Sequence, residues 1–337
     1  MSKVLVTGCA GLLGNHFTRY LLNQGHDVFG VDNLSGGYME YIDNRLIQSE
    51  KRDVRFSYID LLDNEGLNNV FDYFKPNYVY HFAAYAALGL SPFIRNFNYY
   101  NNIIASVNLI NECIKFDVKK FIFASSMDVY GNQQTPFTED MIPKPEDPYG
   151  IAKFAIEMDL VNAWEQFGLN YSIVRPHNII GIYQNIWDRY RNVVGIWIRR
   201  ILNKEPILIY GDGKQRRAFS DVKYYMKPFE QLMTLGDKEI FNIGADKDVS
   251  ILDVALIVQE IAHELGFSPE IQYEEARFEV EIAHCDHSKS KTILDFNDNT
   301  NLHLLINEMF HWAMKQPKRE VRNFKYEIDK NLYNYWK

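Results

Sequence analysis

The chain has 337 residues, of which 47% are hydrophobic and 24% charged, enough for one large α/β domain with a smaller lobe or for two domains. Its net charge of −8, with no lysine- or arginine-rich block, argues against a nucleic-acid partner. Cys9, Cys113 and Cys285 form no CxxC pair, so we expect buried thiols and neither a disulfide nor a metal site. With no signal-peptide pattern and no apolar run of the roughly 18–20 residues that span a membrane, we expect a cytoplasmic protein without a membrane partner.

The first strand is predicted over residues 3–7, and three glycines in a GxxGxxG spacing follow it at once. A helix then runs to about Asn23. Glycines at a strand-to-helix turn let the backbone approach a pyrophosphate, and the helix N-terminus attracts its charge. This arrangement predicts a dinucleotide-binding turn made of Gly8, Gly11, Leu12, Leu13 and Gly14.

The next two strands are predicted to end in acidic residues. The strand over 27–31 leads to Asp32 and Asn33, about 20 residues after the glycines. A carboxylate there accepts hydrogen bonds from an adenosine ribose and repels a 2′-phosphate, which favours NAD over NADP. The strand over 54–59 delivers Asp60 and Leu61 toward the adenine, although Asp60 could instead be a helix cap.

A fourth strand is predicted over 78–84 and ends in Phe82, Ala83 and Ala84, where small side chains leave room for a cofactor. His81 within it is interpreted as a core histidine. A helix then begins near Pro92 or a few residues later and runs to about residue 115. It carries Asn101, whose amide could face the nicotinamide side. Buried strands that alternate with helices predict a Rossmann-type, doubly wound parallel sheet.

The fifth strand, residues 121–124, leads into Ser125 and Ser126, and a helix opens at Tyr149. Tyr149 and Lys153 are four residues apart, so they face the same way on that helix. An ammonium beside a phenol favours the phenolate and brings Tyr149 toward a catalytic pKa. Ser126 could offer its hydroxyl to the same reacting oxygen.

The remaining chain is predicted to form a smaller α/β substrate lobe. After a sixth strand over 171–175 come Pro176 and Asn178, and later a helix over 192–202, a short strand over 207–209 and helices over 250–264 and 302–314. We therefore divide the chain at residue 176: residues 1–176 form the NAD-binding domain, to which some later segments return, and 177–337 form mainly the lobe.

Arginines in this lobe predict a diphosphate ligand, because their forks bind phosphates in a bidentate manner. Arg217, after a Gly-Asp-Gly turn, and Arg277 are the favoured pair, whereas Arg189 and Arg191 could equally be solvated. The aromatic tail over 326–337 is expected to pack on the domain or on a partner subunit.

Together these motifs resemble the extended short-chain dehydrogenase/reductase family of nucleotide-sugar epimerases and dehydratases. The similarity covers nearly the whole chain and includes Gly8/Gly11/Gly14, Asp32-Asn33-Leu34, Asp60-Leu61, His81-Phe82-Ala83-Ala84, Ser125-Ser126, Val129-Tyr130-Gly131, Tyr149-xxx-Lys153, Arg175-Pro176-x-Asn178, Gly211-Asp212-Gly213-x-Gln215-x-Arg217 and Asp286 with Ser288-Lys289. The resemblance implies tightly bound NAD, a lobe that holds a nucleoside diphosphate sugar, and a homodimer through the helices near 95–115 and 149–167.

Within the family the chain resembles the UDP-glucose/UDP-galactose 4-epimerases. This implies NAD-dependent epimerisation at C4 of a UDP-hexose, or of its N-acetyl form, through a transient 4-keto sugar. Tyr149 would take the 4-hydroxyl proton, Lys153 would hold the ribose and lower the pKa of Tyr149, and Ser126 would hydrogen-bond the same oxygen. The resemblance also implies NAD contacts at Asn101, Ser125 and Pro176, and substrate contacts at Ser126, Met127, Asn178, Asn192, Arg217 and Arg277.

Met127 and Asp128 depart from the family patterns, and Ala86 stands where some epimerases have a lysine near the nicotinamide. Met127 stands where 4,6-dehydratases carry the acid that expels the 6-hydroxyl, which weakens that reading. Asp128 occupies the position of the dehydratase glutamate and could be an additional acid/base, or could turn away and bond the backbone. A nucleotide-sugar dehydratase that uses Asp128 is therefore the alternative. A UDP-glucuronate decarboxylase ranks third, because Asn192 stands where such enzymes need an arginine.

Overall fold

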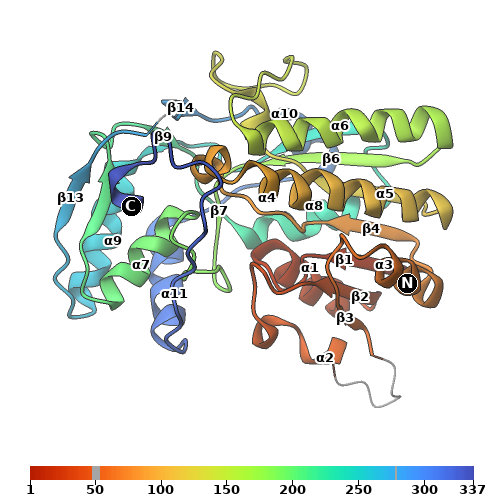
Figure 1. The fold of residues 1–337 in the computed structure, drawn as a ribbon, viewed down its shortest axis with the longest axis horizontal. Coiled ribbons are helices and arrows are strands. Elements are labelled where there is room, and N and C mark those ends of the chain that lie inside the picture. Colours follow the sequence, from red (N-terminus) through yellow and green to blue (C-terminus); the bar gives the residue numbers. More distant parts are fainter. Residues whose placement is uncertain (48–53, 278) are drawn as a thin grey trace.

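A parallel sheet of seven strands forms the centre of the computed structural model, which describes residues 1–47, 54–277 and 279–337 (Figure 1). The strand order is β11-β6-β5-β4-β1-β2-β3, and every neighbouring pair is parallel. The bounds are Lys3–Thr7 (β1), Asp27–Asp32 (β2), Phe56–Tyr58 (β3), Tyr78–His81 (β4), Lys120–Ala124 (β5), Tyr171–Pro176 (β6) and Glu239–Ile243 (β11). The predicted doubly wound sheet is confirmed. Its order reverses between β1 and β4, where open α/β sheets bind ligands.

Helices cover both faces of this sheet and produce two separate cores. Val4 and Val6 of β1 belong to one core and Leu5 to the other, because successive side chains of a strand point to opposite faces. Strands covered on both faces read as continuous apolar runs, which is why the sequence shows them clearly. One core includes α1 (Leu12–Asn23), α2 (Asn44–Ile47), α8 (Met226–Gln231) and α10 (Ser288–Leu294), and the other α3 (Asn64–Phe74), α5 (Ala105–Lys115) and α6 (Pro148–Phe167).

A second lobe lies beside the sheet and has its own core around Trp197 (Figure 1). Three helices pack there: α7 (Val193–Leu202), α9 (Ile251–Glu264) and α11 (Leu302–Met314). Short strands complete it: β8 (Ile207–Tyr210) pairs with β13 (Ile271–Glu274), β9 (Arg216–Arg217) lies between β12 (Val249–Ser250) and β14 (Ile282–Ala283), and β7 (Ile179–Ile180) pairs with β10 (Ser220–Asp221).

Several elements of the structure differ from the predicted ones. Strand β11, which the sequence analysis missed, returns from the later part of the chain to pair with β6. Strands β3 and β4 are shorter than predicted. The helix expected from near Pro92 is broken: α4 (Arg95–Tyr99) passes through a π-helical segment, Tyr100–Ile104, before α5 begins. Side chains compete for carbonyls at this segment, since Asn101 donates to Phe97 and Ser106 donates to Asn102.

The aromatic tail packs on its own chain. Leu332 and Trp336 are buried in a cluster with Tyr85, Phe93 and Tyr190. Glu327 fixes the start of the tail, because its carboxylate accepts hydrogen bonds from the backbone N–H groups at the beginning of α4. Among the described residues, none of the helices has the length and apolar character needed to cross a membrane.

Candidate active site

One cavity of about 540 Å³ lies at the carboxyl ends of the central strands and extends to the second lobe. Residues that follow β1, β2, β4, β5 and β6 form most of its sheet side. All the residues that the sequence analysis selected line it: Gly8, Gly11, Leu12, Leu13, Gly14, Asp32, Asn33, Asp60, Leu61, Phe82, Ala83, Ala84, Asn101, Ser125, Ser126, Met127, Asp128, Tyr149, Lys153, Pro176, Asn178, Asn192, Arg217 and Arg277. Their roles are considered below.

The glycine turn is too tight for side chains. Gly8 has φ +71°, and a Cβ on it would lie 2.7 Å from the backbone nitrogen of Ala83. A Cβ on Gly14 would lie 2.1 Å from the carbonyl oxygen of Gly8. Helix α1 starts after Gly11 without a side-chain cap, so its first N–H groups are available to an anion. This cradle, which any Cβ would fill, fits the pyrophosphate of a dinucleotide.

Two carboxylates, Asp32 and Asp60, accept hydrogen bonds at the ends of β2 and β3. Asp32 accepts hydrogen bonds from the backbone N–H of Ala10 (2.9 Å) and of Leu34 (2.7 Å). Burial raises the pKa of Asp32, while these N–H groups and the charge of Arg191 oppose the rise. Asn33 donates to Asp60 over 2.8 Å. The pair of carboxylates at the ends of β2 and β3 suits a ribose and repels an extra phosphate, so the cavity fits NAD.

Tyr149 is presented by the first turn of α6. Asp147 caps that helix by accepting from the backbone N–H of Tyr149 (2.8 Å) and Gly150 (3.1 Å), and Pro148 occupies the first position. An Asp-Pro pair before a helix is a sequence signal that the analysis did not use. Burial and the charge of Asp128 raise the pKa of Tyr149, and a hydrogen bond with Ser126 opposes the rise. The lowering of this pKa by Lys153 stays a prediction.

Lys153 points toward the end of β5. Its Nζ donates to the carbonyl oxygen of Ala124 over 2.7 Å and lies 5.8 Å from the ring centre of Tyr149. Burial lowers the pKa of Lys153 to about 7, and the carboxylate of Glu157 opposes that shift. Burial thus weakens, and Glu157 restores in part, the positive charge that Lys153 can place beside Tyr149.

A buried ion pair between Arg175 and Glu157 lies next to Ser125. The sequence analysis did not predict this pair. Arg175 of β6 donates to Glu157 of α6 through Nε (3.0 Å) and Nη2 (2.6 Å). Ser125 also donates to Glu157. Both charged side chains are buried, with 2% and 3% of their surface exposed. The contact joins α6 to β6, so no local sequence pattern could reveal it.

The carboxylate of Asp128 is hydrogen-bonded to Ser126. The Ser126 hydroxyl donates to its carboxylate over 3.1 Å, and Asp128 lines the cavity. Burial, and secondly the nearby charge of Asp147, raise the pKa of Asp128 to about 7, while Ser126 and Arg217 oppose the rise. Met127 is buried in an apolar cluster with Val129 and Phe137. The Asp128 carboxylate is therefore bonded by a side-chain hydroxyl, and its role as an acid/base stays a prediction.

The pH dependence of stability tests this environment. A carboxyl whose folded pKa is about 7 binds more protons when folded than when unfolded, so it lowers stability as pH rises from about 4 to 7. We expect Asp128→Asn to remove that loss and to raise the melting temperature more at pH 8 than at pH 5. Melting curves at the two pH values measure it; an equal shift at both would contradict the raised pKa.

The residues expected to contact the substrate also line the cavity. Arg217 donates to Glu279 over 2.8 Å, and the Arg277 guanidinium lies 3.5 Å from the ring centre of Tyr210. Asn178 (φ 41°) has a buried amide nitrogen without a partner among the described residues. Asn192 (φ 67°) precedes α7. Their contacts with a substrate stay predictions.

Arg191 is part of the wall and not a solvated surface charge. It donates to Asp188 over 2.9 Å, and its guanidinium lies 4.5 Å from the ring centre of Tyr85. Tyr85 also donates to Asp188 (3.0 Å), and Asp188 is fully buried. Asn102 holds Tyr85 by its backbone, accepting from its N–H over 2.9 Å. The sequence offered only a polar loop here, without a signal for the pairing.

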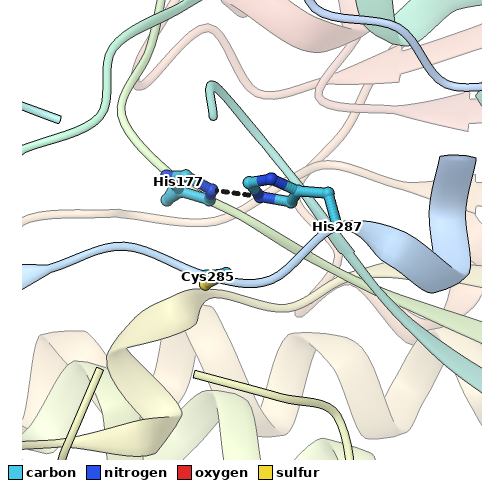
Figure 2. Close-up of side chains that lie close together, drawn as sticks. All are labelled: His177, Cys285 and His287. Carbon is cyan, nitrogen blue, oxygen red and sulfur yellow. Dashed lines mark hydrogen bonds between the residues drawn. The ribbon is translucent and has the colours of Figure 1, made fainter. Parts of the chain in front are cut away.

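Two histidines and a cysteine meet beside the cavity (Figure 2). The Nε2 atoms of His177 and His287 are 2.8 Å apart in nearly coplanar rings, and His287 Nδ1 lies 3.1 Å from Asp246. At this distance one Nε2–H donates a hydrogen bond to the other Nε2. Cys285, which is distant in sequence from His177, joins them, and the expectation of no metal site stays a prediction. The observed contact ties the end of β6 to the segment before α10.

Comparisons with known proteins agree with this architecture. The family model for the NAD dependent epimerase/dehydratase family matches residues 4–244. The UDP-glucose 4-epimerase of Caenorhabditis elegans is 28% identical, over 94% of this chain and 98% of its own. The UDP-glucuronate 4-epimerase of Thermodesulfobacterium geofontis is 29% identical, over 93% and 96%. The structure of the Thermotoga maritima UDP-glucose 4-epimerase with UDP-glucose superposes with a TM-score of 0.85, at 32% identity, over 93% of this chain and 99% of that one. The chain therefore belongs to the NAD dependent epimerase/dehydratase family.

Proposed function

We propose that the protein epimerises C4 of a UDP-hexose through a transient 4-keto sugar, with NAD held permanently in the site. The observation that carries this proposal is the position of Ser126 and Tyr149, which meet in one cavity with a dinucleotide cradle and an arginine-lined end. UDP-glucose, UDP-galactose and their N-acetyl forms are the proposed substrates. The similarity to 4-epimerases over nearly the whole chain supports this choice.

The residues of the chain divide the work as follows. Tyr149 takes the proton from the 4-hydroxyl and returns it, and Ser126 holds the same oxygen by a hydrogen bond. Lys153, once a ribose hydroxyl competes for its Nζ, positions that ribose. The cradle at Gly8 and the carboxylate of Asp32 hold the dinucleotide. NAD supplies the hydride acceptor and donor when bound.

A panel of UDP-sugars tests the proposal directly. Purified protein without added NAD is incubated with UDP-glucose, UDP-galactose, their N-acetyl forms and UDP-glucuronate, and proton NMR follows the sugars. We expect interconversion at C4 for at least one pair. Formation of a 4-keto-6-deoxy or unsaturated sugar, with no C4 epimer, would contradict it.

Arg217 is the proposed diphosphate contact, and Arg277 accompanies it. Each guanidinium already has protein partners, Glu279 and the ring of Tyr210, that orient it. We expect Arg217→Met to raise KM by about tenfold or more, because a charge-assisted bond to phosphate is lost, with a smaller change in kcat. Steady-state kinetics measure both. Arg216→Met is the matched control, since Arg216 pairs with Asp248 and does not line the cavity; equal effects would refute the assignment.

Asp128 favours a second candidate function, nucleotide-sugar dehydration. Its pKa of about 7 would suit an acid/base at neutral pH. We expect Asp128→Asn to keep C4 interconversion, because Tyr149 and Ser126 remain. Should the variant lose a dehydrated product that the unmodified protein forms, Asp128 would be a catalytic residue and the dehydratase would be the function. The decarboxylase remains third, since Asn192 offers no positive charge.

Exposed apolar side chains on α6 support a homodimer. Met158, Val161 and Phe167 expose 53%, 41% and 65% of their surface, although they lie on a helix of the main domain. Tyr100 and Ile104, at the bend between α4 and α5, are also exposed, and Figure 1 shows these helices side by side. Such a patch indicates an interface.

We propose that the protein is located in the cytoplasm. Its three cysteines are buried and form no disulfide, which suits a reducing compartment.

A further inference from the structure

A second cavity of about 280 Å³ lies behind the wall of the first, between α7 and the aromatic tail. Three arginines line it, Arg189, Arg199 and Arg200, whereas Glu205 is the one acidic residue of the lining that the structure describes. Ile196, Leu208 and Tyr210 line both cavities. The excess of positive charge in this cavity requires an explanation that the proposed reaction does not give.

Arg199 carries the argument. Only 7% of its surface is exposed, its Nε is buried without a hydrogen-bond partner, and no described residue forms an ion pair with its guanidinium. Burial lowers the pKa of Arg199, the charge of Glu205 opposes this, and Arg200 and Arg189 lower it further. A buried guanidinium without an ion pair in contact with it costs free energy, and a bound anion would compensate that cost.

The other two arginines are already oriented by the protein. Arg200 donates to the carbonyl of Pro206 (2.7 Å) and pairs with Glu205 (3.0 Å). Arg189 donates to Asn323 (3.1 Å) and to the carbonyl of Tyr335 (2.8 Å). They add positive potential at fixed positions, and Arg199 provides the unused donors. Planar guanidinium groups match phosphate oxygens.

We propose that this second cavity is an anion site for a phosphate-class ligand, in which Arg199 makes the principal contact. The site is separate from the arginines assigned to the substrate diphosphate, Arg217 and Arg277, neither of which lines it. Either a free phosphate or a phosphate group on a larger molecule would satisfy Arg199.

Calorimetric titration of the full-length protein with inorganic pyrophosphate tests the site, with UDP present to occupy the first cavity. We expect binding that weakens about tenfold or more in Arg199→Met, because a charge-assisted contact is lost, and that strengthens in Glu205→Gln. Arg216→Met, outside both cavities, should bind like the unmodified protein. The same titration in the Arg217→Met background without UDP keeps the test independent of the proposed substrate. Titration with a phosphate monoester in place of pyrophosphate separates the two sources of the ligand.

Stability gives a second readout that a merely structural arginine would not produce. Without pyrophosphate, Arg199→Met should melt at a higher temperature than the unmodified protein, because the buried unpaired charge is gone. Added pyrophosphate should stabilise the unmodified protein and leave the variant unchanged. Arg199→Lys, which keeps the charge, serves if the methionine variant does not fold, and should retain part of the binding. Unaltered pyrophosphate affinity in Arg199→Met, or no binding by the unmodified protein, would overturn the proposal.

Discussion

Replacing Tyr149 with phenylalanine should lower the rate of C4 epimerisation by about 10²–10⁴-fold, the usual contribution of a positioned acid/base. The phenol oxygen is the group that would take the 4-hydroxyl proton, and Ser126 lines the same cavity. Steady-state rates with UDP-glucose measure the loss. The fold should survive, because the ring remains buried and only the hydroxyl is removed.

A nearby tyrosine gives the matched control. Tyr130 is fully buried in the adjacent segment and donates to Asn242 over 2.8 Å, but it does not line the cavity. Tyr130→Phe should lose some stability and keep nearly all of its activity per folded molecule. If Tyr149→Phe retained full activity, with every other property unchanged, Tyr149 would not be the catalytic residue.

The buried Glu157–Arg175 pair should produce the largest effect on stability. Glu157→Gln leaves the Arg175 guanidinium charged in a buried place, which costs about 3–5 kcal/mol. Denaturant unfolding followed by fluorescence measures the free energy of unfolding. The double variant Glu157→Met/Arg175→Met should recover much of that loss, because two apolar side chains replace both charges. A single and a double variant of equal stability would contradict the uncompensated-charge argument.

The same change should also move the pH dependence of activity. Glu157 raises the pKa of Lys153 against the effect of burial, which leaves that pKa at about 7. Without the carboxylate the pKa of Lys153 falls further, so its ammonium form is confined to lower pH. We expect the residual epimerase activity of Glu157→Gln to be greatest at a more acidic pH than that of the unmodified protein. An unchanged pH profile would show that Glu157 acts on stability alone.

The cofactor cradle could be predicted from the sequence because its signals are local. Gly8 and Gly14 must be glycines because other backbone segments lie too close to leave room for a Cβ. Asp32 ends an apolar strand that is easily recognised. The Tyr149–Lys153 spacing was also readable, since both lie on one helix. Family resemblance then supplied the order of the remaining motifs. All these residues line the first cavity.

The contacts that tune the site could not be predicted, because they join distant segments. Lys153 bonds the carbonyl of Ala124 and Arg175 pairs with Glu157, so the charges around Tyr149 depend on how α6 packs against β5 and β6. Asp128 acquires its raised pKa from burial and from Asp147, which a long loop separates from it. Strand β11 was missed for a similar reason: it becomes a central-sheet strand only by pairing with β6.

The central claim is that C4 of the sugar is oxidised and reduced within one closed site. Incubation of the purified protein with UDP-glucose deuterated at C4, without added cofactor, tests it most directly. NMR and mass spectrometry should find UDP-galactose that keeps the deuterium at C4, because the hydrogen that leaves that carbon returns to it. Epimerised product with hydrogen from water at C4, or a sugar altered at C6 with C4 not inverted, would contradict the account.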